Sequence, residues 1–239
     1  MIFKYGNVKI EIPQGYEFVY YATFIVGEYD HIHVKKDDIV LDAGAFVGDF
    51  TLKIARKVKE VVAVEPLPWA FELLKKNVEA NELKNVILIN KALYDEDTTL
   101  TLSDEGVGSK LGEGNLTVNT ITIDELGRNF TVVKMDIEGA EGKVMKGEWI
   151  NSVREIAIEL HGKENIERVT SYLVSHGFKL TEMKMNHLLI NTFKNVLLHF
   201  PSFVDAERKS KVLYSAIFKK KYYVPALQRE EIKIVYGRK

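Results

Sequence analysis

The chain contains 239 residues with a formal net charge of −1, and 46% of the residues are hydrophobic, 28% charged and 10% aromatic. This composition is typical of a folded globular protein, and the length fits one large domain or one domain with an appendage. The absence of cysteine excludes disulfides, thiolate zinc sites, iron–sulfur clusters and a cysteine nucleophile. A net charge so close to zero provides no overall attraction to nucleic acid.

Targeting signals are absent from the sequence. No stretch of about 18 uncharged apolar residues occurs, so no transmembrane segment is predicted. The first residues, Met1 to Gly6, lack the apolar core of a signal peptide. We therefore expect a cytoplasmic protein.

Charge is unevenly distributed along the chain. From Pro201 onward, ten Lys or Arg residues stand against four acids, so this tail carries +6 and the preceding residues carry −7. Such an asymmetry indicates an appended functional segment. We expect three parts, which are an N-terminal hairpin with a cap helix (1–38), a main domain (39–200) and a basic C-terminal appendage (201–239).

Hydrophobic patterning predicts the elements in chain order. Alternation over 2–12 favours a hairpin, and 20–34 is expected to form the cap helix. Short apolar runs are typical of buried parallel strands, and they occur at 39–42, 61–65, 86–89, 131–135 and 155–160. Helices are predicted between these strands at 49–57, from Pro66 or Pro68 to Ala80, at 140–147 and at 163–176.

Four further strands are predicted. Segments 100–102 and 116–123 are expected to pair around the glycine-rich loop 106–115, and 178–183 and 187–191 to add the last strands. Strands that alternate with helices predict an α/β fold with a doubly wound, mostly parallel sheet, right-handed crossovers and helices on both faces.

The turn after the first strand reads Asp42-Ala43-Gly44-Ala45-Phe46-Val47-Gly48. In open α/β sheets, ligands bind at the carboxyl ends of the strands. Gly44 allows a ligand to approach the main chain, and Gly48 allows a helix to pack closely. Phe46 stands where the dinucleotide fingerprint has its second glycine, which favours a nucleoside ligand without a pyrophosphate. The alternative is a plain tight turn.

Polar residues also follow the next strands. Glu65 ends the second strand and is placed to accept both ribose hydroxyl protons, although it could instead cap the helix beside Pro66. Ala92 and its neighbours follow the third strand, where an adenine ring can meet the backbone. Asp136 and Glu138 follow the fourth, where two carboxylates stabilise a sulfonium cation or a metal, or else complement a helix dipole. Together these residues favour S-adenosylmethionine as the ligand.

Four motifs, taken in order, resemble the FkbM family of methyltransferases over residues 39–191. They read Val40-Leu41-Asp42-Ala43-Gly44-Ala45, Val64-Glu65-Pro66, Thr120-Ile121-Thr122-Ile123-Asp124 and Val133-Lys134-Met135-Asp136-Ile137-Glu138-Gly139-Ala140-Glu141. The last run, followed later by Glu159-Leu160-His161, is the most specific part. The first two motifs are shared by most Rossmann-type methyltransferases.

This resemblance implies a seven-stranded Rossmann-like sheet, S-adenosylmethionine as cofactor and O-methylation as the usual reaction, with 39–200 as the methyltransferase domain. It carries cofactor contacts onto Asp42, Gly44, Glu65 and Asp136. With the adjoining turn positions, the expected cofactor-binding residues are Asp42, Gly44, Ala45, Gly48, Glu65, Pro66, Ala92 and Asp136.

Methylation of a hydroxyl requires the loss of its proton, and the candidate bases are His161, Glu138 and Asp136. We favour His161 because it follows the fifth strand on the ligand edge; the alternative is a capping or packing histidine. A second version uses Mg²⁺ or Mn²⁺ to acidify a diol, with Asp136, Glu138, Glu159 and His161 as a partial ligand set. His187 is expected to be structural.

The acceptor is not defined by these motifs. We expect a sugar, a glycan or a small metabolite, with RNA methylation as the alternative and non-catalytic cofactor binding as the third option. The loop 106–115 is either a lid or a plain hairpin loop. The segment 204–221, apolar beside a basic face, is expected to dock on its own domain, on anionic lipid or on RNA.

Overall fold

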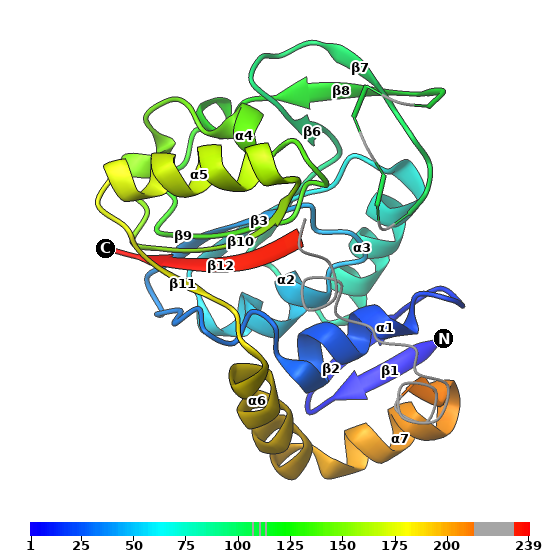
Figure 1. Ribbon diagram of the computed structural model, residues 1–239. Helices are drawn as coiled ribbons and strands as arrows, with labels where there is room; N and C mark the ends of the chain where they lie inside the picture. The colour runs from blue at the N-terminus through cyan, green and yellow to red at the C-terminus, as the bar shows by residue number, and fades with distance from the viewer. Residues whose placement is uncertain (107, 110, 113, 213–231) are drawn as a thin grey trace.

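A seven-stranded sheet forms the centre of the computed structural model, which describes residues 1–106, 108–109, 111–112, 114–212 and 232–239 (Figure 1). Its strand order is β11-β12-β10-β9-β3-β4-β5. The strands are β3 (Ile39–Ala43), β4 (Glu60–Val64), β5 (Val86–Ile89), β9 (Val132–Met135), β10 (Glu155–His161), β11 (Lys179–Glu182) and β12 (Ile232–Arg238). Only β12 runs antiparallel to its neighbours. The expected doubly wound, mostly parallel sheet is confirmed.

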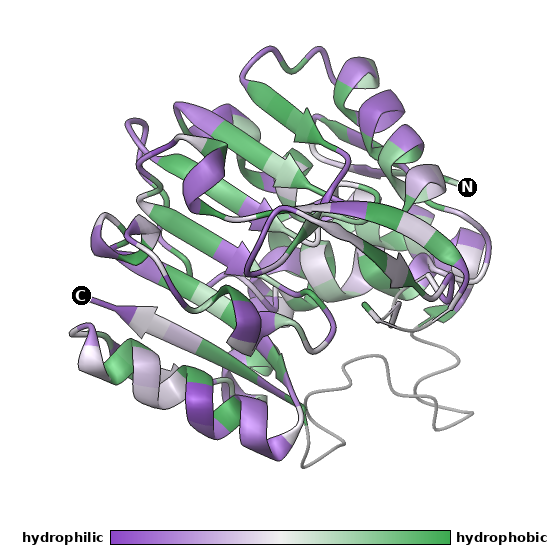
Figure 2. Cartoon of the chain, turned by 90° about the horizontal axis from the view of Figure 1, so that it is seen from above, coloured by the Kyte–Doolittle hydropathy of each residue, from purple (hydrophilic) through white to green (hydrophobic). Residues whose placement is uncertain are grey.

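Helices cover both faces of this sheet, as expected. They are α2 (Asp49–Ile54), α3 (Pro68–Ala80), α4 (Glu141–Val144) and α5 (Lys163–Ser175). Alternate strand residues point to opposite faces, so Leu41 belongs to the core under Leu173 of α5, while Val40 belongs to the core with Phe50 of α2. Both faces are buried, and the strands therefore carry nearly continuous apolar sequences (Figure 2).

Smaller elements surround the central sheet. The expected hairpin is confirmed as β1 (Ile2–Tyr5) and β2 (Val8–Glu11). A three-stranded sheet contains β6 (Ala92–Leu93), β7 (Thr99–Leu102) and β8 (Leu116–Ile121), and its β7–β8 pair was expected. Short helical turns are α1 (Glu17–Tyr20), η1 (Tyr21–Val26), η2 (Ala55–Lys57), η3 (Asp124–Leu126) and η4 (Trp149–Asn151). None of the helices within the described ranges has the length and apolar character needed to cross a bilayer.

Two expected elements are wrong in extent or type. The cap helix predicted over 20–34 ends at Val26, because Gly27 adopts a left-handed conformation with φ +69° and closes the helix. The strand predicted over 187–191 lies instead within a helix, α6 (Met185–Leu198), which is followed by α7 (Phe200–Ser210). His187 is therefore a helical residue.

The seventh strand comes from the C-terminal tail. Residues Ile232–Arg238 form β12, which inserts between β10 and β11 and pairs with both. The expected boundary near residue 200 does not separate an appendage from the domain, because the end of the tail completes the central sheet. Residues 213–231, which hold part of the expected docking segment, lie outside the described residues.

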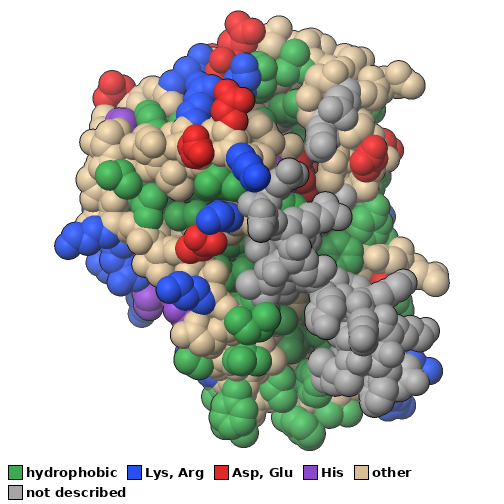
Figure 3. Space-filling model, in the orientation of Figure 1, with side chains coloured by type: hydrophobic (Ala, Val, Ile, Leu, Met, Phe, Trp, Pro, Cys, Tyr) green, Lys and Arg blue, Asp and Glu red, His purple; other side chains and the backbone are tan. Residues whose placement is uncertain are grey.

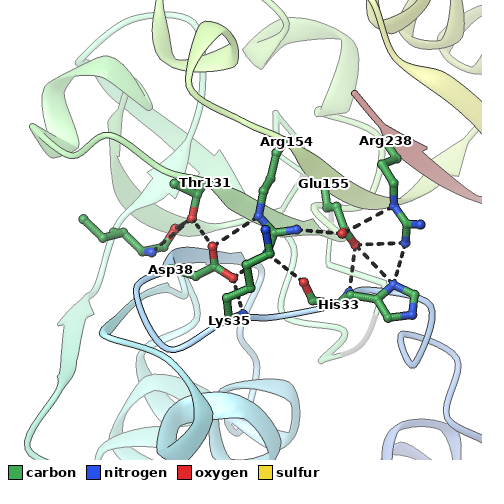
Figure 4. Close-up of polar contacts among 8 residues, drawn as sticks. His33, Lys35, Asp38, Thr131, Arg154, Glu155 and Arg238 are labelled. Atoms are coloured by element: carbon green, nitrogen blue, oxygen red, sulfur yellow. Dashed lines mark hydrogen bonds and ion pairs between the residues drawn. The ribbon is translucent and has the colours of Figure 1, made fainter.

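An ion-pair network joins the loop before β3 to the amino ends of the sheet (Figure 4). Arg154 lies 2.5 Å from Asp38 and 2.6 Å from Glu155, and its guanidinium also donates to the carbonyl oxygen of His33. Arg238, at the end of β12, lies 3.4 Å from Glu155. The network lies at the amino edge of β10, opposite the edge where a ligand of this fold binds. We interpret it as structural.

Deleting residues 232–239 is expected to abolish cooperative folding, because β10 and β11 lose their common partner. Ile234→Ala, at a buried position of β12, is expected to lower the free energy of unfolding by about 2–5 kcal/mol. Urea unfolding followed by circular dichroism measures both effects. Lys233→Ala is the matched control: its ion pair with Glu182 is exposed, so the change should stay below about 1 kcal/mol. A wild-type transition in the truncated chain would contradict the role given to β12.

Candidate active site

The winding of the sheet reverses between β3 and β9, since β4 and β5 extend to one side and β9 and β10 to the other. A cleft of about 620 Å³, open mouth included, lies at the carboxyl ends of these strands. Both its place and its size are typical of small-molecule sites in this class of fold. Of the eight residues expected to bind a cofactor, five line the cleft: Gly44, Glu65, Pro66, Ala92 and Asp136.

Gly44 sits where β3 and β9 come closest. Its φ of +74° lies in the left-handed region, and a Cβ at this position would lie 1.8 Å from the carbonyl oxygen of Asp136. The amide of Gly44 donates to the carbonyl oxygen of Val64 over 3.0 Å. Only glycine satisfies both the conformation and the space, so the main chain itself forms this wall of the cleft.

Asp42 does not line the cleft, contrary to expectation. Its carboxylate is fully buried, with Oδ1 3.2 Å from Nζ of Lys134 and Oδ2 accepting a 2.6 Å hydrogen bond from Thr51. Lys134 also donates to the carbonyl oxygen of Gly44 over 2.7 Å. Burial would lower the pKa of Lys134, but the carboxylates around it raise the pKa above its ordinary value. Asp42 therefore supports the Gly44 turn through a buried ion pair.

Ala45 and Gly48 also lie outside the cleft lining. Gly48 precedes α2 with a φ of +91°, and a Cβ there would lie 2.5 Å from Cδ1 of Leu74 in α3. Gly48 thus leaves room for Leu74 of α3, whereas the sequence predicted close packing between a helix and a strand. Ala45 is buried in the apolar core beneath the turn.

Glu65 makes the contact at the start of α3 that was one of the two roles left open by the sequence. Its Oε1 accepts a hydrogen bond of 2.8 Å from the amide of Leu67, the residue that caps α3, and its Oε2 accepts one of 2.7 Å from the amide of Phe46. Burial raises the pKa of Glu65 to about 7, against the effect of these two donors. Each carboxylate oxygen has a second lone pair, so the group can still accept hydrogen bonds from a ligand in the cleft.

Phe46 forms an aromatic wall that sequence reasoning did not assign to the site. It adopts a φ of +47°, which is unfavourable for a residue with a Cβ. Its ring lies 5.4 Å from those of Tyr16 and Trp69. The described part of the loop 106–115 contributes Gly106 and Gly108 to the cleft lining; residues 107, 110 and 113 lie outside the described residues.

Carboxylates surround His161 at the end of β10. Nδ1 of His161 lies 3.2 Å from Glu141, and Nε2 lies 3.3 Å from Glu138 and 3.9 Å from Glu159. Glu141 is fully buried and also accepts hydrogen bonds from the amide of Gly139 and the side chain of Asn165. The histidine ring is thus held between two carboxylates from the turn that follows β9.

The electrostatics of this cluster change the role expected for His161. Burial alone would lower its pKa, but the hydrogen bond with Glu141 and the charges of Asp136 and Glu138 raise the pKa to about 10. An imidazolium has no lone pair with which to accept a proton. A protonated His161 would not accept a proton at neutral pH, whereas the sequence favoured it as the general base.

Two acids of the cluster face the cleft in unusual states. Glu138 adopts a left-handed φ of +53°, and burial together with the charge of Asp136 raises its pKa to about 7. Burial also raises the pKa of Asp136, whose buried Oδ1 has no hydrogen-bond partner among the described residues. Strained backbone and unsatisfied polar atoms concentrate at functional sites.

Asp136, Glu138 and His161 each offer one atom that could bind a metal ion, and these three atoms all lie within 4.8 Å of one another. The fourth member of the expected metal set, Glu159, is adjacent but lies outside this group. Sequence reasoning missed the structural roles of Lys134 and Glu141, which both stand in the motif Val133–Glu141. Their positions in that motif are the signal that could have identified them.

His161 is expected to keep both ring protons up to about pH 9. Because its folded-state pKa of about 10 lies above the unfolded value of about 6.5, the charged ring stabilises the fold fully below about pH 6.5, and this contribution is lost as the pH rises towards 10. Nitrogen NMR of the imidazole measures the protonation. Glu141→Gln should lower the pKa, and His161→Gln should remove this part of the pH dependence of stability. A ring that titrates near pH 6.5 would contradict the assignment.

Comparison with known proteins agrees with this geometry. Residues 42–180 match the Methyltransferase FkbM domain. Methyltransferase 1 of Beauveria bassiana is 25% identical over 214 residues, covering 73% of this chain and 84% of that protein. An uncharacterized RNA methyltransferase of Oceanobacillus iheyensis is 39% identical over only 57 residues, covering 24% of this chain and 12% of that protein.

A solved structure shares the fold. The crystal structure of Methyltransferase FkbM from Methylobacillus flagellatus superposes with a TM-score of 0.52 at 18% identity, covering 72% of this chain and 44% of that chain. At this level of identity the match shows the fold alone. The domain match, however, extends over more than half of the sequence, and the chain belongs to the FkbM family of methyltransferases.

Proposed function

We propose that the protein transfers a methyl group from S-adenosylmethionine to a hydroxyl oxygen of a sugar, a glycan or a small metabolite. The observation that carries this proposal is the convergence of Gly44, Glu65, Ala92 and Asp136, which follow four different strands, on one cleft at the point where the sheet reverses. In this class of fold, that point is where a nucleoside ligand binds.

The residues present fit the cofactor. Gly44 has no side chain and lines the cleft with main-chain atoms, and the unpartnered Oδ1 of Asp136 is available to a polar or cationic group. Glu65 would accept the ribose hydroxyl protons, and Ala92 would border the adenine. When bound, the cofactor supplies a methyl group already activated by its sulfonium charge. Negative charge from the buried carboxylates favours a cation in this cleft.

Glu138 is the base that the geometry supports best. Its pKa of about 7 matches a group that accepts a proton near neutral pH. The His161 imidazolium, 3.3 Å away, favours the ionised carboxylate. In the proposed reaction the Glu138 carboxylate would take the proton of the acceptor hydroxyl as its oxygen displaces the methyl group from the sulfonium sulfur, which would leave as a neutral thioether. Asp136 would assist from the other side of the turn, and His161 would position Glu138.

We favour this reaction without a divalent metal. A metal bound by Asp136, Glu138 and His161 would have to displace the ring proton that the surrounding carboxylates stabilise. The imidazolium already supplies a positive charge to this cluster. The Mg²⁺ or Mn²⁺ version remains a separate outcome of the activity test.

The acceptor class is tested by labelled methyl transfer. Purified protein and S-adenosylmethionine with a tritiated methyl group are incubated with fractionated cell extract, and mass spectrometry identifies the labelled product. A labelled methyl ether, formed on a hydroxyl of a sugar, a glycan or a small metabolite, supports the proposal. Label in RNA would favour the alternative activity, RNA methylation, after which the Oceanobacillus iheyensis relative is named. Cofactor binding without turnover on any fraction would indicate a non-catalytic protein.

Titration calorimetry is expected to detect binding of S-adenosylmethionine and its demethylated product, and no binding of NAD. Glu65→Ala should weaken cofactor binding by roughly 1.5–3 kcal/mol, the usual contribution of a hydrogen bond to a charged group. Glu72→Ala, at an exposed position of α3, is the matched control and should bind as the wild type does. If Glu65→Ala stays within twofold of the wild type, the ribose role of Glu65 is wrong. If NAD binds and S-adenosylmethionine does not, the cofactor assignment is wrong.

Glu138→Gln is expected to lower kcat by about 10²–10⁴ with the identified acceptor, while cofactor affinity is retained. The wild-type rate should rise with pH through about 7, because the carboxylate must be ionised to accept the proton. Initial rates across pH, measured with and without EDTA, test both statements. Activity that EDTA abolishes and Mg²⁺ or Mn²⁺ restores would replace this mechanism with the metal-dependent one. A wild-type rate in Glu138→Gln would assign the base to another group.

A further inference from the structure

Helix α6 turns its polar residues towards the protein. Asn195 is buried and donates to Asp30 over 2.9 Å, while its Oδ1 accepts a hydrogen bond of 3.1 Å from the hydroxyl of Tyr5. One turn earlier, Asn191 donates to the carbonyl oxygen of Gly27 over 2.9 Å. These amides fix the helix against η1 and the N-terminal hairpin. Leu188 and Val196 pack into the core on the same side of α6, so hydrogen bonds and apolar contacts together orient the helix.

The opposite side of α6 is apolar and open to solvent. Phe193 is 73% exposed, and the surface continues around it onto the start of α7. We call this surface the α6–α7 face, and its main residues are Leu189, Ile190, Phe193, Leu197, Leu198 and Phe200. Apolar side chains gather at the end of the molecule where α6 and α7 lie (Figures 1 and 3). An amphipathic helix of a monomeric protein normally buries such residues.

Cations accompany this face, and the few acids near it are engaged. Helix α6 contains no Asp or Glu, and its Lys194 is exposed. In α7, Asp205 pairs with Lys209 over 2.5 Å, and Glu207 accepts a hydrogen bond from Tyr21 over 2.8 Å. Arg208 is exposed on the same helix. The face therefore combines large apolar side chains with two exposed cations, Lys194 and Arg208.

We propose that the α6–α7 face docks on a lipid bilayer that contains anionic headgroups. Phenylalanine and leucine on one side of a helix and Lys or Arg beside them are the features of helices that lie in the membrane interface. A second copy of the chain would bring the same cations together across the contact, which is unfavourable. Anionic headgroups instead complement them. This attachment goes beyond the proposed methyl transfer and does not depend on it.

Flotation of the full chain with lipid vesicles tests the proposal. We expect binding to phosphatidylcholine vesicles that contain about 30% phosphatidylglycerol, and much weaker binding to phosphatidylcholine alone. Salt at about 1 M should weaken binding by screening the headgroup contacts. Phe193→Asp with Leu197→Asp should lower the vesicle partition coefficient roughly tenfold or more. Lys194→Glu with Arg208→Glu should reduce the preference for anionic vesicles.

The matched control is Val174→Asp, which changes another exposed apolar residue, 59% accessible on α5 and outside the α6–α7 face. It should bind vesicles as the wild type does. Thermal unfolding checks that every variant is folded, and vesicle binding is compared only among the variants that are folded. Absent vesicle binding, or binding unchanged in Phe193→Asp with Leu197→Asp, overturns the proposal. The proposal is also overturned if vesicle binding is absent and sedimentation velocity shows a dimer of the wild type that the double variant does not form. A second copy of the chain would then cover the face.

Discussion

Lys134 is the buried cation on which the centre of the structure depends. Its partner Asp42 faces it across the β3–β9 pair, so the register of these two strands brings the charges together at the point where the sheet reverses. Both side chains are buried, and removing either partner of such a pair typically destabilises a protein by about 3–5 kcal/mol. The same ammonium group donates to the carbonyl oxygen of Gly44 and so fixes the turn that forms the wall of the cleft.

The remaining charges of the site follow from this arrangement. Carboxylates outnumber cations at the carboxyl edge, and burial raises the pKa values of Glu65, Asp136 and Glu138. Lys134 opposes this effect from within the sheet, and His161 opposes it at the end of β10. A cleft with surplus negative charge stabilises a cationic ligand electrostatically. The same surplus raises the pKa of His161 and leaves the carboxylates as the groups able to accept a proton.

The sequence predicted the central strands because a strand buried on both faces is written as a short apolar run, as in 39–42 and 61–65. It did not predict β12, since a strand's neighbours are set by tertiary packing and Ile232–Arg238 follows a highly charged segment. Among the site residues, the turn positions were predictable from the strand ends. The inward orientation of Asp42 was not, because it depends on Lys134, which is 92 residues away and adjacent only through the sheet register.

Three departures from local rules have different physical origins. Phe46 and Glu138 adopt left-handed conformations that are unfavourable for residues with a Cβ, and both line the cleft. Such strain persists where surrounding contacts hold it. Here these contacts are the hydrogen bond from the amide of Phe46 to Glu65 and the ion pair between Glu138 and His161. Helix α6 departs in another way, because Asn191 and Asn195 face the protein while most of its apolar residues, Leu188 and Val196 excepted, face solvent. The apolar run over 187–191 resembled a buried strand because a sequence pattern shows that residues are apolar, and not what covers them. Only the contacts of a face distinguish a core from a binding surface.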